Sequence, residues 1–330
     1  MNLSLGIVGL PNIGKSTLFN ALTKLEILAE NRPFATIEPN TGIVPLQDKR
    51  LDALTKLSGS KKTIPAVVEF VDIAGLVKGA AEGAGLGNQF LGHIKQTGAL
   101  IHLVRMFKDE SIIHVENRVD PKSDIEIIES ELILKDLETV QKRMNETMVR
   151  MKAKREASTE EYQALLERLR DHMNEGKLAN TLDISGDERV LLHDLNLITL
   201  KPVIYVANVD EGDLHMPDAE LRGKMGLEEK AITAAISVKT EADLVALEPN
   251  EQAEYLDSLG LQESGLSKVA RIGYDSLGLI HFFTTGEKET RAWTIKKGTR
   301  APQAAGTIHT DFEKKFIRME VVSCEELLQA

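Results

Sequence analysis

The sequence of 330 residues contains a single cysteine, Cys324, and no run of about 18 uncharged apolar residues. One cysteine cannot form an internal disulfide, which favours a reducing compartment such as the cytoplasm. Without a long apolar run, no segment is expected to span a membrane. The first residues also lack the basic stretch of a secretory signal, and their apolar side chains lead directly into a glycine-containing turn. These absences predict a soluble, cytoplasmic protein.

Basic residues are fewer than acidic ones: the sequence has 40 Lys and Arg and 51 Asp and Glu, which gives a net charge of −11. This balance excludes a general nucleic-acid coat protein, because phosphate binding needs positive surface; a local basic patch stays open. With 42% hydrophobic and 28% charged residues the composition is globular, and the length predicts two or three domains. The eight histidines and the cysteine show no metal-ligand spacing, so no transition-metal site is expected.

Short apolar runs alternate with helix-like segments in two parts of the chain. The runs cover residues 3–8, 66–71, 99–104, 203–207 and 232–236, and the helix-like segments cover residues 16–28, 51–57, 87–97 and 255–259. Such alternation predicts a doubly wound, mostly parallel α/β sheet, built from residues 1–120 and 200–276.

A long charged segment, residues 121–199, interrupts the strand pattern. Its apolar residues recur at helical spacing in two stripes, namely Leu134, Leu137, Met144, Met148 and Met151, then Tyr162, Leu165, Leu166, Leu169 and Met173. The stripes predict two amphipathic helices joined near Ala157, forming an inserted antiparallel coiled-coil arm. The end of the first helix is basic, with Lys142, Arg143, Arg150, Lys152, Lys154 and Arg155. These charges are either a solvated helix face or a contact surface for RNA or a partner.

Residues 277–330 have a different character and predict a small third module. Residues 281–285, 291–297 and 316–322 are β-like, while residues 302–312 contain turn-forming residues.

The strongest chemical signal is the segment 9–16, Gly-Leu-Pro-Asn-Ile-Gly-Lys-Ser, which matches G-x-x-x-x-G-K-[ST] between a predicted strand and helix. Gly9 and Gly14 let the backbone curl so that successive N–H groups face phosphates, at the positive end of the helix dipole. In such a P-loop, Lys15 neutralises the outer phosphates and the Ser16 hydroxyl ligates Mg²⁺. The motif predicts a nucleotide triphosphate site.

A second phosphate-sensing turn is predicted at Asp72-Ile-Ala-Gly75, after an apolar run. Asp72 is a candidate to hold a magnesium-bound water, and the Gly75 amide a candidate to meet the γ-phosphate. Thr36, between the two motifs, is either a switch threonine that completes the metal shell or a residue of an ordinary turn. Leu76 stands where many GTPases have a glutamine, so another group must orient the attacking water if hydrolysis occurs. The glycine-rich residues 78–87 do not fit a dinucleotide-binding fingerprint.

The base-recognition element is expected after the run at residues 203–207, where the chain reads Asn208-Val209-Asp210-Glu211. A guanine site has N-K-x-D, so Val209 and Glu211 weaken guanine specificity and favour adenine. The Asn208 amide can both donate to and accept from a purine edge. Ser237, after the last run, lies where a loop usually closes over the base.

These motifs resemble the Obg-like ATPases of the YchF type. The resemblance covers essentially the whole chain and is carried by residues 6–23, 36–42, 70–80, 85–90, 291–295 and 301–314. It implies an ATPase that also tolerates GTP, carries the coiled-coil arm, ends in a β-grasp fold called the TGS domain, and associates with ribosomes. Because that domain normally continues beyond the residues present here, residues 277–330 are expected to form a shortened version of it.

The resemblance also assigns individual residues. It places the ATP phosphates on Asn12, Ile13, Gly14, Lys15, Ser16 and Thr17, Mg²⁺ on Ser16 and Thr36, and the base near Asn208, Val209 and Glu211. It implies that His114 positions the attacking water in place of the missing glutamine, and that Asn12 helps hold a monovalent cation such as K⁺.

The leading hypothesis is therefore a slow Mg²⁺-dependent ATPase that acts as a nucleotide switch and associates with the ribosome. A GTP-preferring translation-associated GTPase and a binding adaptor with negligible hydrolysis remain as alternatives. A small-molecule kinase is disfavoured, because phosphoryl transfer to an acceptor needs neither the turn at residues 72–75 nor the element at residues 208–211.

Overall fold

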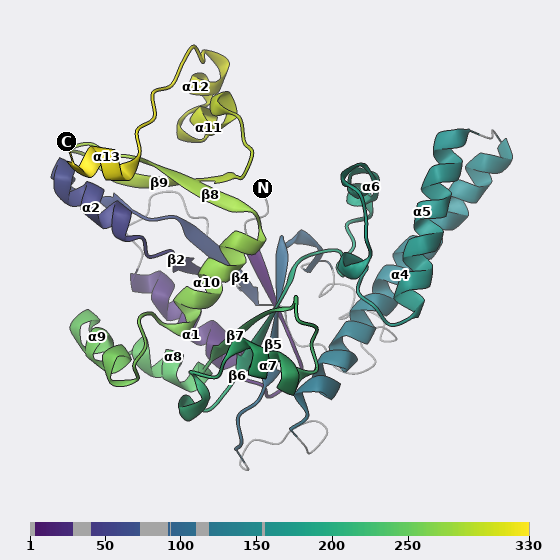
Figure 1. Ribbon diagram of the computed structural model, residues 1–330, viewed down its shortest axis with the longest axis horizontal. Helices are drawn as coiled ribbons and strands as arrows, with labels where there is room; N and C mark the ends of the chain where they lie inside the picture. The colour runs from purple at the N-terminus through teal and green to yellow at the C-terminus, as the bar shows by residue number, and fades with distance from the viewer. Residues whose placement is uncertain are drawn as a thin grey trace.

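The computed structural model describes residues 4–28, 41–72, 92, 94–109, 119–153 and 156–329. Its centre is a six-stranded sheet of order β2-β4-β1-β5-β6-β7 (Figure 1). The strands are β1 (Ser4–Val8), β2 (Thr41–Pro45), β4 (Val67–Asp72), β5 (Ala99–Arg105), β6 (Val203–Asn208) and β7 (Ile232–Ile236). Neighbours are parallel except β2 with β4. The mostly parallel sheet is confirmed, and the antiparallel edge strand β2 is an element that the sequence analysis missed.

Helices cover both faces of this sheet, and the alternation of side chains along β6 shows the division. Ile204 and Val206 pack in one core cluster with residues of α1 (Lys15–Leu28), α8 (Val238–Leu244) and α10 (Gly265–Ser276). Tyr205 and Ala207 pack in another with residues of α4 (Pro121–Ala153) and α7 (Asp218–Met225). The helix α9 (Pro249–Ser258) follows α8. In such a sheet, ligands bind at the carboxyl ends of the parallel strands.

The inserted segment forms two long helices, α4 and α5 (Ala157–Asn174), that pack against each other and project from the sheet (Figure 1). The second predicted stripe is buried from Leu165 to Met173, but Leu134 and Met148 of the first are 53% and 41% exposed. Ile133 and Val140 are buried in their place. The chain returns through η1 (Ala179–Thr181), α6 (Gly186–Leu192) and η2 (His193–Leu195). Within the described residues, no helix, including the 33-residue α4, is long and apolar enough to cross a bilayer.

Buried polar contacts fasten the base of this helix pair to the sheet. The carboxylate of Asp136, on α4, accepts hydrogen bonds from Ile198 N at 3.0 Å and from Thr199 N at 2.7 Å. Burial raises the pKa of Asp136, and these hydrogen bonds oppose the rise. The Lys201 ammonium donates to the carbonyl oxygens of Lys95, at 2.9 Å, and Thr97, just before β5. These contacts anchor the helix pair near the amino-terminal end of β5.

A second, three-stranded sheet has the order β3-β9-β8. β8 (Leu279–Thr284) and β9 (Thr290–Lys296) form an antiparallel hairpin, and β3 (Thr63–Ile64) pairs in parallel with β9. Hydroxyl pairs join Ser58, at the end of α2 (Lys49–Ser58), to Thr285, and Ser60 to Thr290, both at 2.7 Å. The chain continues through α11 (Ala301–Ile308), α12 (Thr310–Lys314) and α13 (Cys324–Gln329). A segment from early in the sequence therefore completes this C-terminal sheet.

Two expectations for the C-terminal module are wrong. The predicted strand at residues 316–322 has no regular structure, and Ile317 and Val321 are 91% and 78% exposed. β-prone residues form a strand only where a neighbouring strand pairs with them, and no described strand does so here. The predicted turns at residues 302–312 are largely helical. Pro302 is compatible with this helix because it lies in the first turn of α11, where a backbone N–H has no partner within the helix.

Candidate functional site

The loop between β1 and α1 follows the geometry that its glycines predict. Gly9 has φ +150°, and a Cβ there would lie 2.4 Å from Ile13 Cδ1 and 2.5 Å from the Leu103 carbonyl oxygen. Gly14 has φ +101°, and its Cβ would lie 2.8 Å from Asn208 Nδ2. Asn12 also has a positive φ, of 62°. No larger side chain fits at Gly9 or Gly14 without displacing its neighbours.

Lys15 begins α1 and folds back over this loop. Its ammonium donates to the carbonyl oxygens of Gly9, at 2.8 Å, and Leu10, at 2.5 Å, and the residue is only 9% exposed. The side chains of Asn12, Ser16 and Thr17 are exposed on the same loop and first helical turn. The loop thus offers a buried cation, exposed hydroxyls and the N-terminal end of a 14-residue helix, which together suit a polyphosphate.

Asn208, the last residue of β6, holds the loop from the other side. Its Nδ2 donates to the Ile13 carbonyl oxygen at 2.9 Å, and its Oδ1 accepts from the Val238 amide at 3.0 Å. The residue is only 5% exposed. One donor and one acceptor of the amide are therefore committed to joining the P-loop, the end of β6 and the start of α8.

The other predicted base-site residues lie at different depths. Val209 is buried beside α7, and its amide donates to the Ile236 carbonyl oxygen at 2.8 Å. Ser237 is the buried N-cap of α8, where its hydroxyl accepts from Thr240 N at 3.3 Å. Glu211 is exposed at the start of η3 (Glu211–Asp213). Of these three side chains, Glu211 alone is open to solvent at the carboxyl edge of the sheet.

The structure also reveals a buried histidine that the sequence analysis did not single out. His102 lies on β5, and burial, together with the charge of Lys15, lowers its pKa to about 3. Its ring centroid lies 5.7 Å from that of Tyr205, whose hydroxyl donates to Glu129 on α4 at 2.5 Å. The neutral imidazole can therefore lie near the P-loop lysine without adding a second positive charge. The only indication of this burial in the sequence is that His102 stands inside the apolar run at residues 99–104.

Several predicted residues lie outside the described part of the chain, namely Thr36, Gly75, Leu76 and His114. For Asp72 the backbone is described: it ends β4 and pairs with Ile7 of β1. Among the described residues, no group of three or more His, Cys, Asp or Glu side chains could hold a metal ion. The exposed Ser16 hydroxyl, next to Lys15, fits the role of a magnesium ligand beside bound phosphates, because Mg²⁺ takes few protein oxygens there.

A buried strand, a glycine loop closed by Lys15 and a following helix, at the carboxyl edge of a mostly parallel sheet, define a P-loop nucleotide-binding protein. A family model described as 50S ribosome-binding GTPase matches residues 4–154, and a model of the C-terminal part of YchF GTPases, described as a protein of unknown function, matches residues 279–330. The chain belongs to the YchF family, as its similarity to whole proteins demonstrates.

The ribosome-binding ATPase YchF of Escherichia coli O157:H7 is 46% identical over 99% of this chain and 90% of its own length. The protein of the same name from Bacillus subtilis is likewise 46% identical, with the same coverage. The solved structure of the Schizosaccharomyces pombe YchF GTPase covers 96% of this chain and 86% of its own, with a TM-score of 0.84 and 40% identity. These similarities extend through the helix pair and the C-terminal sheet.

Proposed function

We propose that this protein is a Mg²⁺-dependent ATPase that also binds GTP, switches slowly between nucleotide states and associates with the ribosome in the cytoplasm. The observation that carries the nucleotide part is the P-loop, in which Lys15 and the Gly9–Gly14 geometry form a phosphate cradle. The names of the bacterial relatives, ribosome-binding ATPases, support the partner and the reaction.

The choice of ATP over GTP rests on the base loop. The guanine motif needs a lysine over the base and an aspartate at its edge, whereas here Val209 is buried and Glu211 has a longer arm. The fission yeast relative is named a GTPase, so the GTP-preferring alternative has support of its own. Calorimetric titration of ATP and GTP with Mg²⁺ decides between them: we expect tighter ATP binding, and a tenfold or greater GTP preference would refute the ATPase assignment.

Within the catalytic site, each residue would have a separate task. Lys15 and the loop amides would bind the phosphates, Ser16 and Thr36 would hold Mg²⁺, and Asp72 would orient the metal's water shell. Bound Mg²⁺ would neutralise phosphate charge. The Gly75 amide would meet the γ-phosphate.

Because Leu76 cannot orient water, we propose that His114 does so and that hydrolysis is slow without a partner. A His114→Ala variant should lose phosphate release while keeping ATP affinity. Asn12 is the proposed K⁺ contact, which predicts faster turnover in KCl than in NaCl.

For the ribosome, we propose that the end of the helix pair makes contact and that the pair and the C-terminal module act as separate units. Arg143 is already paired with Asp194 at 2.8 Å, whereas Lys142, Arg150 and Lys152 are exposed. Reversing these three charges to Glu should abolish co-sedimentation with ribosomes and leave ATP binding unchanged. Unaltered co-sedimentation would place the contact elsewhere, while retained partner binding with no detectable hydrolysis in the unaltered protein would favour the adaptor hypothesis.

A further inference from the structure

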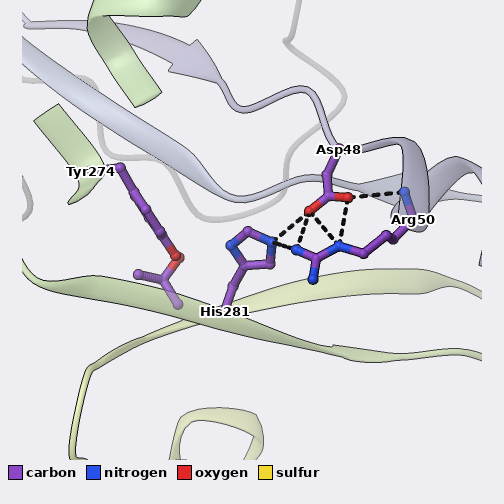
Figure 2. Close-up of polar contacts among 5 residues, drawn as sticks. Asp48, Arg50, Tyr274 and His281 are labelled. Carbon is purple, nitrogen blue, oxygen red and sulfur yellow. Dashed lines mark hydrogen bonds and ion pairs between the residues drawn. The ribbon is translucent and has the colours of Figure 1, made fainter. Parts of the chain in front are cut away.

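Away from the P-loop, a cavity of about 360 Å³ lies where the start of α2, the helix α10 and the strand β8 meet. Asp48 and Arg50 line it at the start of α2, Tyr274 from α10 and His281 from β8 (Figure 2). Arg271, also on α10, is a further lining residue. The cavity volume falls in the range of about 300–1,000 Å³ that is usual for small-molecule sites. The start of α2 and the consecutive elements α10 and β8, which come much later in the sequence, thus border a space of suitable size.

Asp48 is fully engaged by the protein itself. Its carboxylate accepts from Arg50 N at 2.9 Å, from Arg50 Nη2 at 2.7 Å and from His281 Nε2 at 2.8 Å. This carboxylate therefore organises the wall of the cavity and has little capacity left for a ligand.

His281 lines this cavity, and one of its ring nitrogens is buried behind the cavity wall. Because a carboxylate only accepts, the contact with Asp48 assigns a ring proton to Nε2. Nδ1 is buried and has no hydrogen-bond partner among the described residues. In Figure 2 it lies on the side of the ring that faces Tyr274, away from Asp48. His281 therefore supports the wall of the cavity through Asp48, and the exposed polar groups around the opening are those available to a ligand.

The remaining polar groups carry both signs of charge. The guanidinium of Arg271 pairs with Glu263 through Nη2. The hydrogen bonds from the Arg50 side chain to Asp48 use Nε and Nη2, so Nη1 of Arg50 takes no part in them. Three carboxylates, those of Asp48, Glu263 and Asp275, stand against these two guanidinium groups around the cavity. A phosphate dianion would therefore meet net repulsion, and a simple cation would leave both guanidinium groups without an anion.

We propose that this cavity binds a zwitterionic α-amino acid with an apolar side chain. Its carboxylate would accept from Arg50 and Arg271, and its ammonium group would donate to the carboxylate of Glu263. Leu46, Leu279 and Ile280 line the same cavity and would contact the side chain. None of these residues belongs to the P-loop, so this inference is independent of the proposed ATPase activity.

Calorimetric titration of the full chain with L-leucine and L-phenylalanine tests the proposal. We expect saturable binding in the micromolar to millimolar range, which is lost when the ammonium is acetylated or the carboxylate is esterified. Arg271→Gln should weaken binding about tenfold or more, because it removes a charge-assisted hydrogen bond to the ligand carboxylate. The matched control is Arg168→Gln, which breaks a similar exposed Arg–Glu pair, 2.7 Å to Glu188, outside the cavity.

A second variant tests the proposal independently if Arg271→Gln does not fold. Ser267, on α10, also lines the cavity. Ser267→Phe would fill the cavity without removing a charge and should abolish amino-acid binding while ATP binding persists. No saturable binding of either amino acid, equal binding of the acetylated or esterified analogues, or full affinity in both cavity variants would overturn the proposal. Binding of ribose 5-phosphate in place of the amino acids would also overturn it and would identify an anion site.

Discussion

The side-chain amide of Asn208 donates a hydrogen bond of 2.9 Å to the carbonyl oxygen of Ile13, 195 positions earlier in the chain. The same side chain accepts from the Val238 amide at 3.0 Å. The phosphate-binding loop and the expected base-binding loop therefore share one buried connection. A substitution of Asn208 is therefore expected to affect both loops.

Asn208→Ala should weaken both the fold and the nucleotide site. Removing the amide leaves the Ile13 carbonyl and the Val238 N–H buried without these partners, which costs about 1–3 kcal/mol each. We expect a lower midpoint of urea unfolding and weaker ATP binding by calorimetry. Asn20→Ala, the same change at an exposed position on α1, should alter neither; equal behaviour of the two variants would contradict the connecting role.

Lys15→Gln should separate nucleotide affinity from stability. The glutamine amide can still donate to the Gly9 carbonyl, but it carries no charge to meet a phosphate, so ATP affinity should fall roughly tenfold to a hundredfold. Titration with ATP and Mg²⁺ measures the change, and Lys24→Gln, exposed on the same helix, is the control. Unchanged ATP affinity in Lys15→Gln would refute the phosphate role of this lysine.

Gly14→Ala should disrupt the P-loop through backbone strain. The residue has φ +101°, and the new Cβ would lie 2.8 Å from Asn208 Nδ2, so the loop must shift. We expect a destabilisation of about 1–3 kcal/mol with loss of ATP binding. Gly212→Ala, where no atom lies within 4 Å of the added Cβ, should retain both properties. A normal ATP affinity in Gly14→Ala would mean that the loop tolerates another conformation.

Asp48 should make the stability of the protein sensitive to acid. Burial alone would raise its pKa, but hydrogen bonds from the Arg50 side chain, His281 and the Arg50 amide, with the charge of Arg50, hold the pKa well below its usual range. Its stabilising contribution is therefore complete above the unfolded pKa of about 3.9 and is lost as the pH falls through the lower folded pKa.

Asp48→Asn should lower the urea midpoint at neutral pH, and its difference from the unaltered protein should shrink below about pH 4. Asp52→Asn, exposed on the same helix, serves as the control. A difference between Asp48→Asn and the unaltered protein that stays constant down to acid pH would argue against an ionised Asp48 as the source of the stability.

The pKa of Glu129 is shifted in the opposite direction to that of Asp48. Burial raises its pKa, the hydrogen bond from Tyr205 lowers it, and the charge of Glu126 raises it further, with a net rise. The folded state therefore gains stability below the unfolded pKa of about 4.3, and this gain is lost as the pH rises through the folded pKa. Glu129→Gln, which still accepts from Tyr205, should raise the urea midpoint at neutral pH.

At acid pH the Glu129→Gln variant should match the unaltered protein. Glu138→Gln, exposed on the same helix, should have little effect at any pH, because surface ion pairs contribute little. A lower urea midpoint for Glu129→Gln than for the unaltered protein at neutral pH would contradict the conclusion that burial disfavours the ionised Glu129 carboxylate.

The sequence predicted the parts of the molecule whose structure is decided locally. The P-loop follows from the glycines at positions 9 and 14 and from the change of period between strand and helix, so its residues lie where expected. The five parallel strands are short buried apolar runs, which are recognisable without knowledge of their partners. The helix pair was also visible, because its apolar residues recur at helical spacing.

The errors arose where distant partners decide the outcome. The apolar residues at 316–322 looked like a strand, but no described strand pairs with them. Ile133 and Val140 are buried in place of the predicted Leu134 and Met148, because the neighbouring segments determine which side of α4 is covered. The contacts of Asn208 and the burial of His102 beside Lys15 likewise depend on tertiary packing that no local pattern encodes.

The pairing of β3 with β9 has a consequence for how the chain is made. Ser58 and its partner Thr285 are 227 positions apart, so the α2–β3 segment leaves the ribosome long before the hairpin that it joins. At about 5–20 residues per second, that segment waits roughly ten to forty-five seconds for its partners. Because strands pair only once both have been synthesised, the C-terminal sheet is expected to be among the last parts of the molecule to mature.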